Sequence, residues 1–321
     1  NEILVTGCAG FIGFHTCLKL IKNNNYVCGI DNLSHYYDPK LKVRRLSILK
    51  KNKKFKFNKI NIKNNKKIYQ IFKKNKFDCV VHLAAQAGVR YSTNKPRVYL
   101  DTNINGFFNV LDASRIFNVK HFIFASSSSV YGDSNKFPSK EIDNTDKPLS
   151  FYSATKKSNE VLAHAYSNIY KLPCTGLRFF TVYGPFGRPD MSFIKFVKAI
   201  KKSKNIDFFN KGNHVRDFTF VDDATNAVSK ILNKSSRKII PYQIFNIGSN
   251  NPVKLKVYLR IIEKVLKKKA KINYKPIQKG DVLKTHASIK ALNQIIKYKP
   301  KTKLINGINK FIVWFNEYYK Y

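Results

Sequence analysis

The chain has 321 residues, of which 43% are hydrophobic, and it includes 25 phenylalanines and 18 tyrosines. This composition suffices for one large core and a smaller second lobe, and it excludes a disordered basic tail. The apolar runs fall short of the ~18 residues that cross a bilayer, so we expect no membrane span.

The charge of the chain is strongly positive. Sixty Lys and Arg residues against 19 Asp and Glu residues give a formal net charge of +41, which favours anionic ligands, nucleic acids among them. The lysines are spread along the whole chain beside abundant Asn and Ile, which is typical of a compositional drift expressed on solvated surface. We therefore expect no specific nucleic-acid partner. A basic nucleic-acid-binding protein on a reused fold is the hypothesis from a different class.

The cysteines indicate a reducing environment. There are five, an odd number, and none forms a C-x-x-C pair. Several lie in apolar contexts, so we expect reduced core cysteines in a cytoplasmic protein and no metal site. The chain begins with a strand and a turn, which is not the pattern of a signal peptide.

The first elements predict a dinucleotide-binding unit. Residues 2–6 are predicted to form a buried strand that runs into a glycine-rich turn, Gly7, Gly10 and Gly13, and then into a helix over 14–22. This order places a diphosphate against the amides of a helix N-terminus. A second strand over 26–30 ends in Asp31, at the distance expected for the acid that holds the adenosine ribose. An acid there repels a 2′-phosphate and favours NAD over NADP.

The next elements alternate between strand and helix. We predict helices over 41–50, 65–74 and 101–116, strands over 55–61, 79–85 and 121–125, and a serine run over 126–129. Small Ala84 and Ala85 would let a dinucleotide lie against the backbone, and Asn103 could face the pocket. Ligands bind beyond the carboxyl ends of parallel strands. The serines are therefore either a solvated turn or donors to a substrate oxygen, and the local pattern leaves both open.

Tyr152 and Lys156 are four residues apart, so on a helix they leave the same face. A nearby lysine cation favours the phenolate, and a pKa near 7 requires about 4 kcal/mol of electrostatic help relative to the reference value. The spacing alone is weak, because lysine is common in this chain.

The composition changes after residue 178. A Gly- and Pro-rich loop over 182–190 precedes a helix over 192–201, a strand with an acidic helix start over 216–223, a strand over 242–247 and a helix over 302–319. We predict an α/β fold, a Rossmann-type doubly wound parallel sheet with a smaller, mostly helical C-terminal domain. The NAD-binding domain would span 1–178, joined again by about 214–247, and the substrate domain 179–321.

Five runs carry a family resemblance: residues 4–13, 82–91, 125–132, 152–157 and 178–191. With them the chain resembles the extended short-chain dehydrogenase/reductase family, in its sugar-nucleotide epimerase branch. It is most similar to the bacterial UDP-glucuronate 4-epimerases, over nearly its whole length. The runs 82–91 and 178–191 are the more specific ones, because family members differ in the loops that touch the sugar.

The resemblance implies a reversible oxidation at C4 of a UDP-sugar. Tyr152 as phenolate would take the proton of the 4-hydroxyl while the hydride passes to tightly held NAD. Lys156 would lower the pKa of Tyr152 and hold the nicotinamide ribose. Ser127 and Ser129 would bond the 4-oxygen. Related decarboxylases and dehydratases carry an acid where this chain has Ser129, so the hydroxyl favours epimerisation.

The resemblance also implies two sets of binding residues. For the cofactor they are Gly7, Gly10, Phe11, Ile12, Gly13, Asp31, Asn32, Asn61, Ile62, Leu83, Ala84, Ala85, Asn103, Tyr152 and Lys156. For the substrate they are Arg90, Ser127, Thr181, Arg188, Arg216 and Asp281. Arg188 would grip the glucuronate carboxylate, since guanidinium binds carboxylate bidentately. Arg216 would meet the UDP phosphates and Asp281 the uridine.

Two positions distinguish this chain from relatives, and alternative functions follow from the same motifs. Asn61 stands where relatives usually carry Asp beside the adenine, and Thr181 stands where galactose epimerases usually carry Asn. The alternative functions are a UDP-glucose/galactose 4-epimerase and a UDP-glucuronate decarboxylase. Relatives commonly pair through a helix bundle, which implies a homodimer. Galacturonate production suggests a role in polysaccharide precursor supply.

Overall fold

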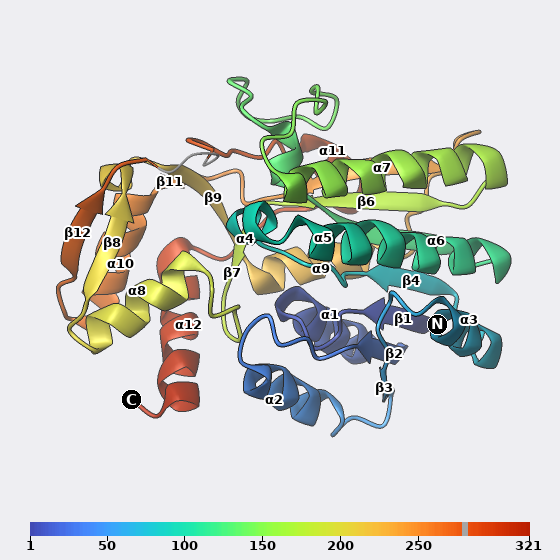
Figure 1. Ribbon diagram of the computed structural model, residues 1–321, viewed down its shortest axis with the longest axis horizontal. Coiled ribbons are helices and arrows are strands. Elements are labelled where there is room, and N and C mark those ends of the chain that lie inside the picture. The colour runs from blue at the N-terminus through green and yellow to red at the C-terminus, as the bar shows by residue number, and fades with distance from the viewer. Residues whose placement is uncertain (278–281) are drawn as a thin grey trace.

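The computed structural model describes residues 1–277 and 282–321, and its centre is a seven-stranded parallel sheet (Figure 1). The strands lie in the order β10-β6-β5-β4-β1-β2-β3. Their bounds are β1 Glu2–Thr6, β2 Tyr26–Asp31, β3 Phe55–Lys59, β4 Cys79–His82, β5 His121–Ser127, β6 Cys174–Phe179 and β10 Tyr242–Ile247. The chain builds outward from β1 to β3 and then crosses back to β4, so the order reverses between β1 and β4. Ligands bind at that point in doubly wound sheets.

Helices cover both faces of this sheet. Their bounds are α1 Phe11–Lys22, α2 Pro39–Leu49, α3 Asn65–Lys74, α4 Val89–Asn94, α5 Pro96–Tyr99, α6 Gly106–Ile116, α7 Phe151–Tyr170 and α9 Val221–Ile231. Successive residues of β1 point to opposite faces. Ile3 and Val5 join the core that contains α1 and α9, and Leu4 joins the core that contains α3 and α6. The predicted Rossmann-type sheet is therefore confirmed.

Helix α7 is begun by a reciprocal cap. The Ser150 hydroxyl accepts from the Ser153 amide at 3.1 Å, and the Ser153 hydroxyl accepts from the Ser150 amide at 3.0 Å. The two bonds satisfy amides that have no partner within the helix. Lys156, Asn159 and Glu160 lie on its buried side. The cap therefore fixes the start of the helix at Phe151, one residue before Tyr152.

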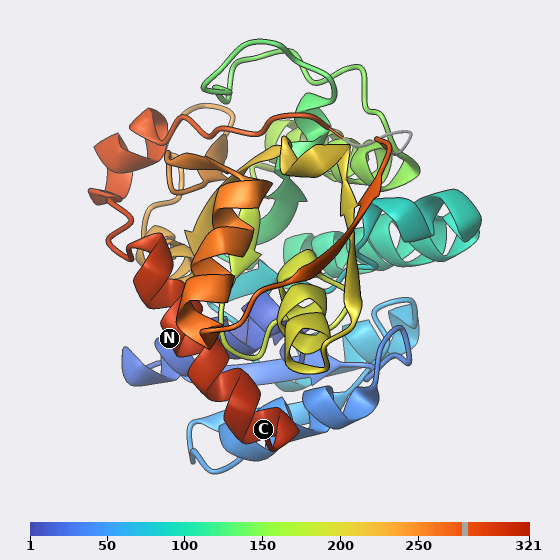
Figure 2. The same ribbon diagram turned by 90° about the vertical axis from the view of Figure 1, so that its left-hand side faces the viewer.

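A second lobe, at the left of Figure 1 and facing the viewer in Figure 2, follows β6. It contains β7 Thr181–Tyr183, β9 Val215–Phe220 and β11 Pro252–Lys254 in one sheet, and β8 Asn205–Phe209 paired with β12 Lys271–Lys275 in another. Its helices are α8 Ser192–Lys201, α10 Leu255–Leu266 and α12 Leu304–Tyr319, whereas α11 Lys290–Ile296 contacts β10 of the large sheet and α9. Strand β10 returns to the large sheet. Of the five strands in this lobe, the sequence had indicated only β9.

The helix predicted over 101–116 has two parts. Residues Leu100–Asn105 form a π-helical segment, and the α-helix proper begins at Gly106. Asn103 lies in the wider turn, where its amide accepts from the Gln86 amide at 2.8 Å and donates to the Thr155 hydroxyl at 3.0 Å. This side chain therefore fastens the turn after β4 to α7.

No helix in the described parts of the chain is long and apolar enough to cross a membrane. The five cysteines are free and buried, as expected.

Candidate active site

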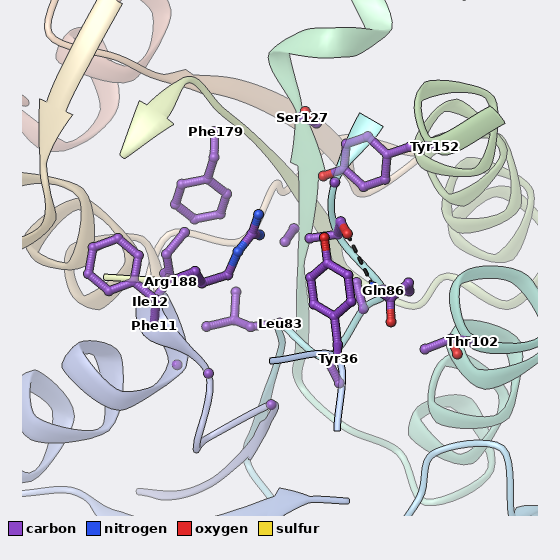
Figure 3. A pocket seen from close by; sticks show the side chains of 18 of the residues that line it. Phe11, Ile12, Tyr36, Leu83, Gln86, Thr102, Ser127, Tyr152, Phe179 and Arg188 are labelled. Carbon is purple, nitrogen blue, oxygen red and sulfur yellow. Dashed lines mark hydrogen bonds between the residues drawn. The ribbon is translucent and has the colours of Figure 1, made fainter. Parts of the chain in front are cut away.

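A cavity of about 660 Å³ lies beyond the carboxyl ends of the parallel strands. Most of the predicted site residues line it: Gly7, Gly10, Phe11, Ile12, Gly13, Asp31, Asn32, Asn61, Ile62, Leu83, Ala84, Ala85, Ser127, Ser129, Tyr152, Lys156, Thr181, Arg188 and Arg216. Figure 3 shows several of them around the opening. Residues separated by more than 200 positions thus meet at the edge where the sheet reverses its order.

The glycine turn at the start of α1 is open to an anion. Gly7 has a φ of +71°, and a Cβ at Gly13 would lie 2.0 Å from the Gly7 carbonyl oxygen. A side chain at either position would therefore strain or block the turn. Gly10 caps α1 without any side-chain hydrogen bond, and the first helical turn carries no acidic residue. The free amides of Phe11 and Ile12 thus face the cavity, as a diphosphate requires.

Asp31 is fixed at the end of β2. Its carboxylate accepts from the Ala9 amide at 3.1 Å and from the Leu33 amide at 2.8 Å. Burial raises the pKa of Asp31 above its usual value, and the two amides oppose that shift. With one oxygen on each amide, the carboxylate keeps lone pairs for further donors. Asp31 therefore suits the two hydroxyls of a ribose.

The wall beyond Asp31 suits an adenine. Ile62 is 5% exposed and leaves its edge on the cavity. A Cβ at Gly106 would lie 2.7 Å from the Ile62 side chain, so the glycine makes room for it. The Asn61 side chain accepts from the Lys63 amide at 3.1 Å. The turn, the acid and this wall together fit an extended dinucleotide.

Two predicted residues do not line the cavity. Asn103, predicted to bind cofactor, is 2% exposed and is used by Gln86 and Thr155 instead. Arg90, predicted to bind substrate, lies with its guanidinium 5.2 Å from the centre of the Phe209 ring. Asp281 lies outside the described residues.

Tyr152 and the serines form the polar centre of the cavity (Figure 3). The Ser127 hydroxyl accepts from the Ser129 hydroxyl at 2.9 Å and from the Ser129 amide at 3.2 Å. Burial raises the pKa of Tyr152, while its hydrogen bond with Ser127 and the nearby Arg188 cation act to lower it. The serines are thus part of the site rather than a solvated turn.

Lys156 is buried beneath Tyr152. It is 3% exposed, and its ammonium donates to the Ala125 carbonyl at 2.8 Å. Burial lowers the pKa of Lys156 to about 8. The sequence had assigned the lowering of the Tyr152 pKa to Lys156. In this structure Ser127 and Arg188 act in that direction, while the Lys156 ammonium donates to a carbonyl of β5, and the role of Lys156 stays a prediction.

Arg188 brings a positive charge into the cavity. Its Nε and Nη2 donate to the two carboxylate oxygens of Asp190 at 3.0 and 2.9 Å. In Figure 3 its guanidinium lies in the middle of the cavity, between the rings of Phe179 and Tyr36. Arg216 lies farther out, where its Nη1 donates to the Val215 carbonyl at 3.0 Å.

Sequence reasoning missed several lining residues. Of the lysines in the described ranges, Lys42 and Lys156 are the buried ones, and both line this cavity. The Lys42 ammonium donates to the Ser34 carbonyl and hydroxyl at 2.7 and 2.8 Å. Tyr36 and Phe179 were also missed. A Tyr-Tyr-Asp-Pro run before a helix was the available signal for Tyr36.

Within residues 1–277 and 282–321, no group of three His, Cys, Asp or Glu side chains could hold a metal ion.

The fold and the site define a nucleotide-dependent sugar-modifying enzyme of the Rossmann type. The NAD dependent epimerase/dehydratase family matches residues 3–248, and the chain belongs to that family.

Individual relatives match over almost the whole chain. Protein CapI of Staphylococcus aureus is 49% identical over 99% of both chains. UDP-glucuronate 4-epimerase 4 of Arabidopsis thaliana is 44% identical over 99% of this chain and 76% of the relative. The crystal structure of UDP-glucuronic acid 4-epimerase from Bacillus cereus, in complex with UDP-glucuronic acid and NAD, is similar with a TM-score of 0.93 and 33% identity. That match covers 99% of this chain and 100% of the other.

Proposed function

We propose that this protein is an NAD-dependent epimerase that inverts C4 of UDP-glucuronate to give UDP-galacturonate. The Arabidopsis and Bacillus relatives support this proposal. The observation that carries it is the shared cavity: the Arg188 guanidinium lies in the same space as the Tyr152 phenol and the Ser127 hydroxyl. A uronate has a carboxylate that can pair with Arg188 and a 4-hydroxyl that can bond Tyr152 and Ser127.

Tyr152 acts as the base and then as the acid of the reaction. Its phenolate removes the proton of the 4-hydroxyl, and its phenol returns that proton after the sugar has turned over. Ser127 and Ser129 hold the 4-oxygen by hydrogen bonds while its charge changes. When bound, NAD supplies the hydride acceptor at C4 and the donor that restores it on the other face. Gly7, Asp31 and their neighbours hold this cofactor along the cavity.

The electrostatics of the cavity support this role for Tyr152. Burial alone holds its pKa too high for a base, and the Arg188 cation opposes burial. The same cation pairs with the substrate carboxylate. A 4-keto uronate is a β-keto acid that can lose carbon dioxide, and a carboxylate bound by a guanidinium is kept as an anion in a fixed direction. The hydroxyl of Ser129, in place of an acid, disfavours the decarboxylase alternative.

The test is turnover followed by the NMR signals of the sugar protons. UDP-galacturonate should appear from UDP-glucuronate until equilibrium, with no UDP-xylose. Arg188→Ala should lower kcat/KM for UDP-glucuronate about a hundredfold or more, because a buried charge pair to the substrate is lost. Because Arg188 also acts on the pKa of Tyr152, the two sugars are compared by binding: the dissociation constant of UDP-glucose should rise far less than that of UDP-glucuronate.

A matched arginine provides the control. Arg97 forms a surface pair with Asp101 and has 80% of its side chain exposed. Arg97→Ala should leave turnover and both dissociation constants unchanged. Equal losses of affinity for both sugars in Arg188→Ala, or no UDP-galacturonate from the wild-type protein, would refute the uronate assignment.

We further propose a cytoplasmic homodimer without a nucleic-acid partner. Exposed apolar side chains lie on α6 and α7: Phe108 is 43% exposed, Val161 56% and Ile169 65%. A second copy would cover this face. Light scattering should give twice the chain mass, and Val161→Lys should give a monomer. The free cysteines support a reducing compartment.

A further inference from the structure

One edge of the Arg188 guanidinium is hydrogen-bonded to Asp190, and its other edge is open to the cavity. Its two bonds to Asp190 use Nε and Nη2, in the parallel, two-bond geometry that fixes a guanidinium in its plane. The remaining edge, with Nη1, is the one that a ligand in the cavity can reach (Figure 3). The direction of that edge depends on where Asp190 is held.

Asp190 is itself held by Tyr36. The Tyr36 hydroxyl donates to the Asp190 Oδ2 at 3.2 Å, across 154 positions of sequence. This is the oxygen that accepts from the Arg188 Nη2. Tyr36 stands in the connection that follows β2, the strand that ends in Asp31, and leads to α2. A side chain from the first lobe therefore reaches the partner of the arginine in the loop after β7.

The position of the Tyr36 ring is determined by its surroundings. Its centre lies 4.9 Å from that of the Tyr91 ring. Gly88 leaves room for it, since a Cβ at Gly88 would lie 2.6 Å from the Tyr36 hydroxyl oxygen. The ring contacts do not need the hydroxyl, so replacing Tyr36 by Phe removes one hydrogen bond and leaves the ring in place.

The backbone of the arginine loop has anchors of its own. The His15 Nε2 lies 2.9 Å from the Pro185 carbonyl oxygen, and the Arg45 Nη2 donates to the Phe186 carbonyl at 2.5 Å. Both anchors come from the first lobe and neither involves Tyr36. Loss of the Tyr36 hydroxyl therefore frees the side chains of Asp190 and Arg188 without releasing the loop.

We propose that Tyr36 is a positioning residue for uronate recognition: through Asp190, its hydroxyl sets the direction in which Arg188 meets the substrate carboxylate. This inference rests on the proposed function and names a residue that determines its specificity. A neutral UDP-sugar has no carboxylate for Arg188, so its binding does not depend on that direction. Tyr36 therefore favours UDP-glucuronate over UDP-glucose through Asp190 and Arg188.

The experiment compares dissociation constants of both UDP-sugars for the NAD-bound protein by titration calorimetry. Tyr36→Phe should raise the constant for UDP-glucuronate about tenfold, since hydrogen bonds to charged groups contribute at that level. It should leave the constant for UDP-glucose within about twofold. The wild-type protein and the Tyr36→Phe variant have the same net charge in the cavity, so the substitution should not change anion binding in general.

Tyr69→Phe is the matched control. The Tyr69 hydroxyl donates to the Asp112 carboxylate at 2.6 Å, between α3 and α6 and away from the cavity. The variant removes the same kind of bond, and the constants for both sugars should stay at their wild-type values.

A double variant distinguishes positioning from direct contact. In an Arg188→Ala background, Tyr36→Phe should cause no further loss, because residues that act through one another are not additive. A further loss there, or an equal loss for both sugars in the single variant, would overturn the inference. A wild-type protein that prefers UDP-glucuronate and a Tyr36→Phe variant with the same preference would overturn it while leaving the proposed function intact. No preference in the wild-type protein would overturn both.

Discussion

Glu160 and Arg178 form a two-bond ion pair inside the protein. The Arg178 Nε donates to the Glu160 Oε1 at 2.8 Å and the Nη2 to the Oε2 at 2.9 Å, with side chains 4% and 3% exposed. Glu160 belongs to α7, two turns after Tyr152, and Arg178 to β6, which lies beside the strand that ends at Ser127. The pair therefore fixes the helix that carries Tyr152 against the sheet that carries Ser127.

Removal of one partner should be costly. Arg178→Met leaves the Glu160 carboxylate buried without its counterion, and we expect the free energy of unfolding to fall by about 3–5 kcal/mol. Urea denaturation at neutral pH measures this. Arg97→Met, which breaks the exposed pair with Asp101, should cause little change. Similar effects of the two substitutions would show that burial does not set the strength of the Arg178 pair.

A second buried carboxylate holds the outer wall of the cavity. Asp217 is 0% exposed and accepts from the amides of Ser249, Asn250 and Ala287 at 2.6, 3.0 and 3.0 Å. Asp217→Asn turns an amide group toward these donors. We expect a loss of about 2–3 kcal/mol in the free energy of unfolding. The KM for the UDP-sugar should rise as well, because the neighbouring Arg216 lines the cavity.

The control for Asp217 is another aspartate with an amide partner. Asp207 accepts from the Asn273 side chain at 2.7 Å on the exposed ribbon of β8 and β12. Asp207→Asn should change neither the urea midpoint nor the KM. A normal KM in a destabilised Asp217→Asn protein would contradict the expected effect on substrate binding and leave Asp217 with a role in stability alone.

The parts of the site that follow local rules could be predicted from sequence. Gly7, Asp31 and the Tyr152–Lys156 spacing each occupy a fixed place in a strand–turn–helix unit, and the structure brings them to one cavity. What escaped prediction depends on contacts between distant segments. Tyr36 meets Asp190 across 154 positions, and no periodicity of either segment encodes that meeting.

Two predicted site residues lie outside the cavity lining. Asn103 was expected to face the pocket, but it lies in a π-helical segment and bonds Gln86 and Thr155. Arg90 was assigned to the substrate from a family motif, but its guanidinium packs over Phe209 of the second lobe. A local change of helix type sets the surroundings of Asn103 and packing between the lobes sets those of Arg90, and a motif carries no information on either.

Tyr152→Phe tests the base directly. The ring keeps its edge contact with Tyr99, whose centre lies 6.1 Å away, so the cavity retains its shape. Turnover of UDP-glucuronate should fall by a factor of about 10² to 10⁴, the usual contribution of proton transfer. Binding of UDP-glucuronate, measured by calorimetry, should change little. Tyr26→Phe, at an exposed edge position, should keep full activity. Retained turnover in Tyr152→Phe would remove the tyrosine from the mechanism.

Three histidines with lowered pKa values should make the fold sensitive to acid. Burial lowers the pKa of His15 to about 4, of His82 to about 3 and of His121 to about 4. The unfolded chain titrates these groups near the reference pKa of about 6.5 and so binds protons first. Their contribution to stability is complete above that pH and is lost as the pH falls toward 4.

The size of this effect follows from the proton count. Each histidine can cost up to about 2 kcal/mol of stability by about pH 5, at 1.36 kcal/mol per unit and per proton. Urea denaturation at a series of pH values measures how steeply the free energy of unfolding changes with pH. His121 bonds the Leu232 carbonyl and the Thr175 hydroxyl through its two ring nitrogens, so a glutamine can replace both contacts. Below pH 6.5, His121→Gln should reduce the slope of the free energy of unfolding against pH by the equivalent of up to one bound proton. An unchanged slope would assign the acid sensitivity to other groups.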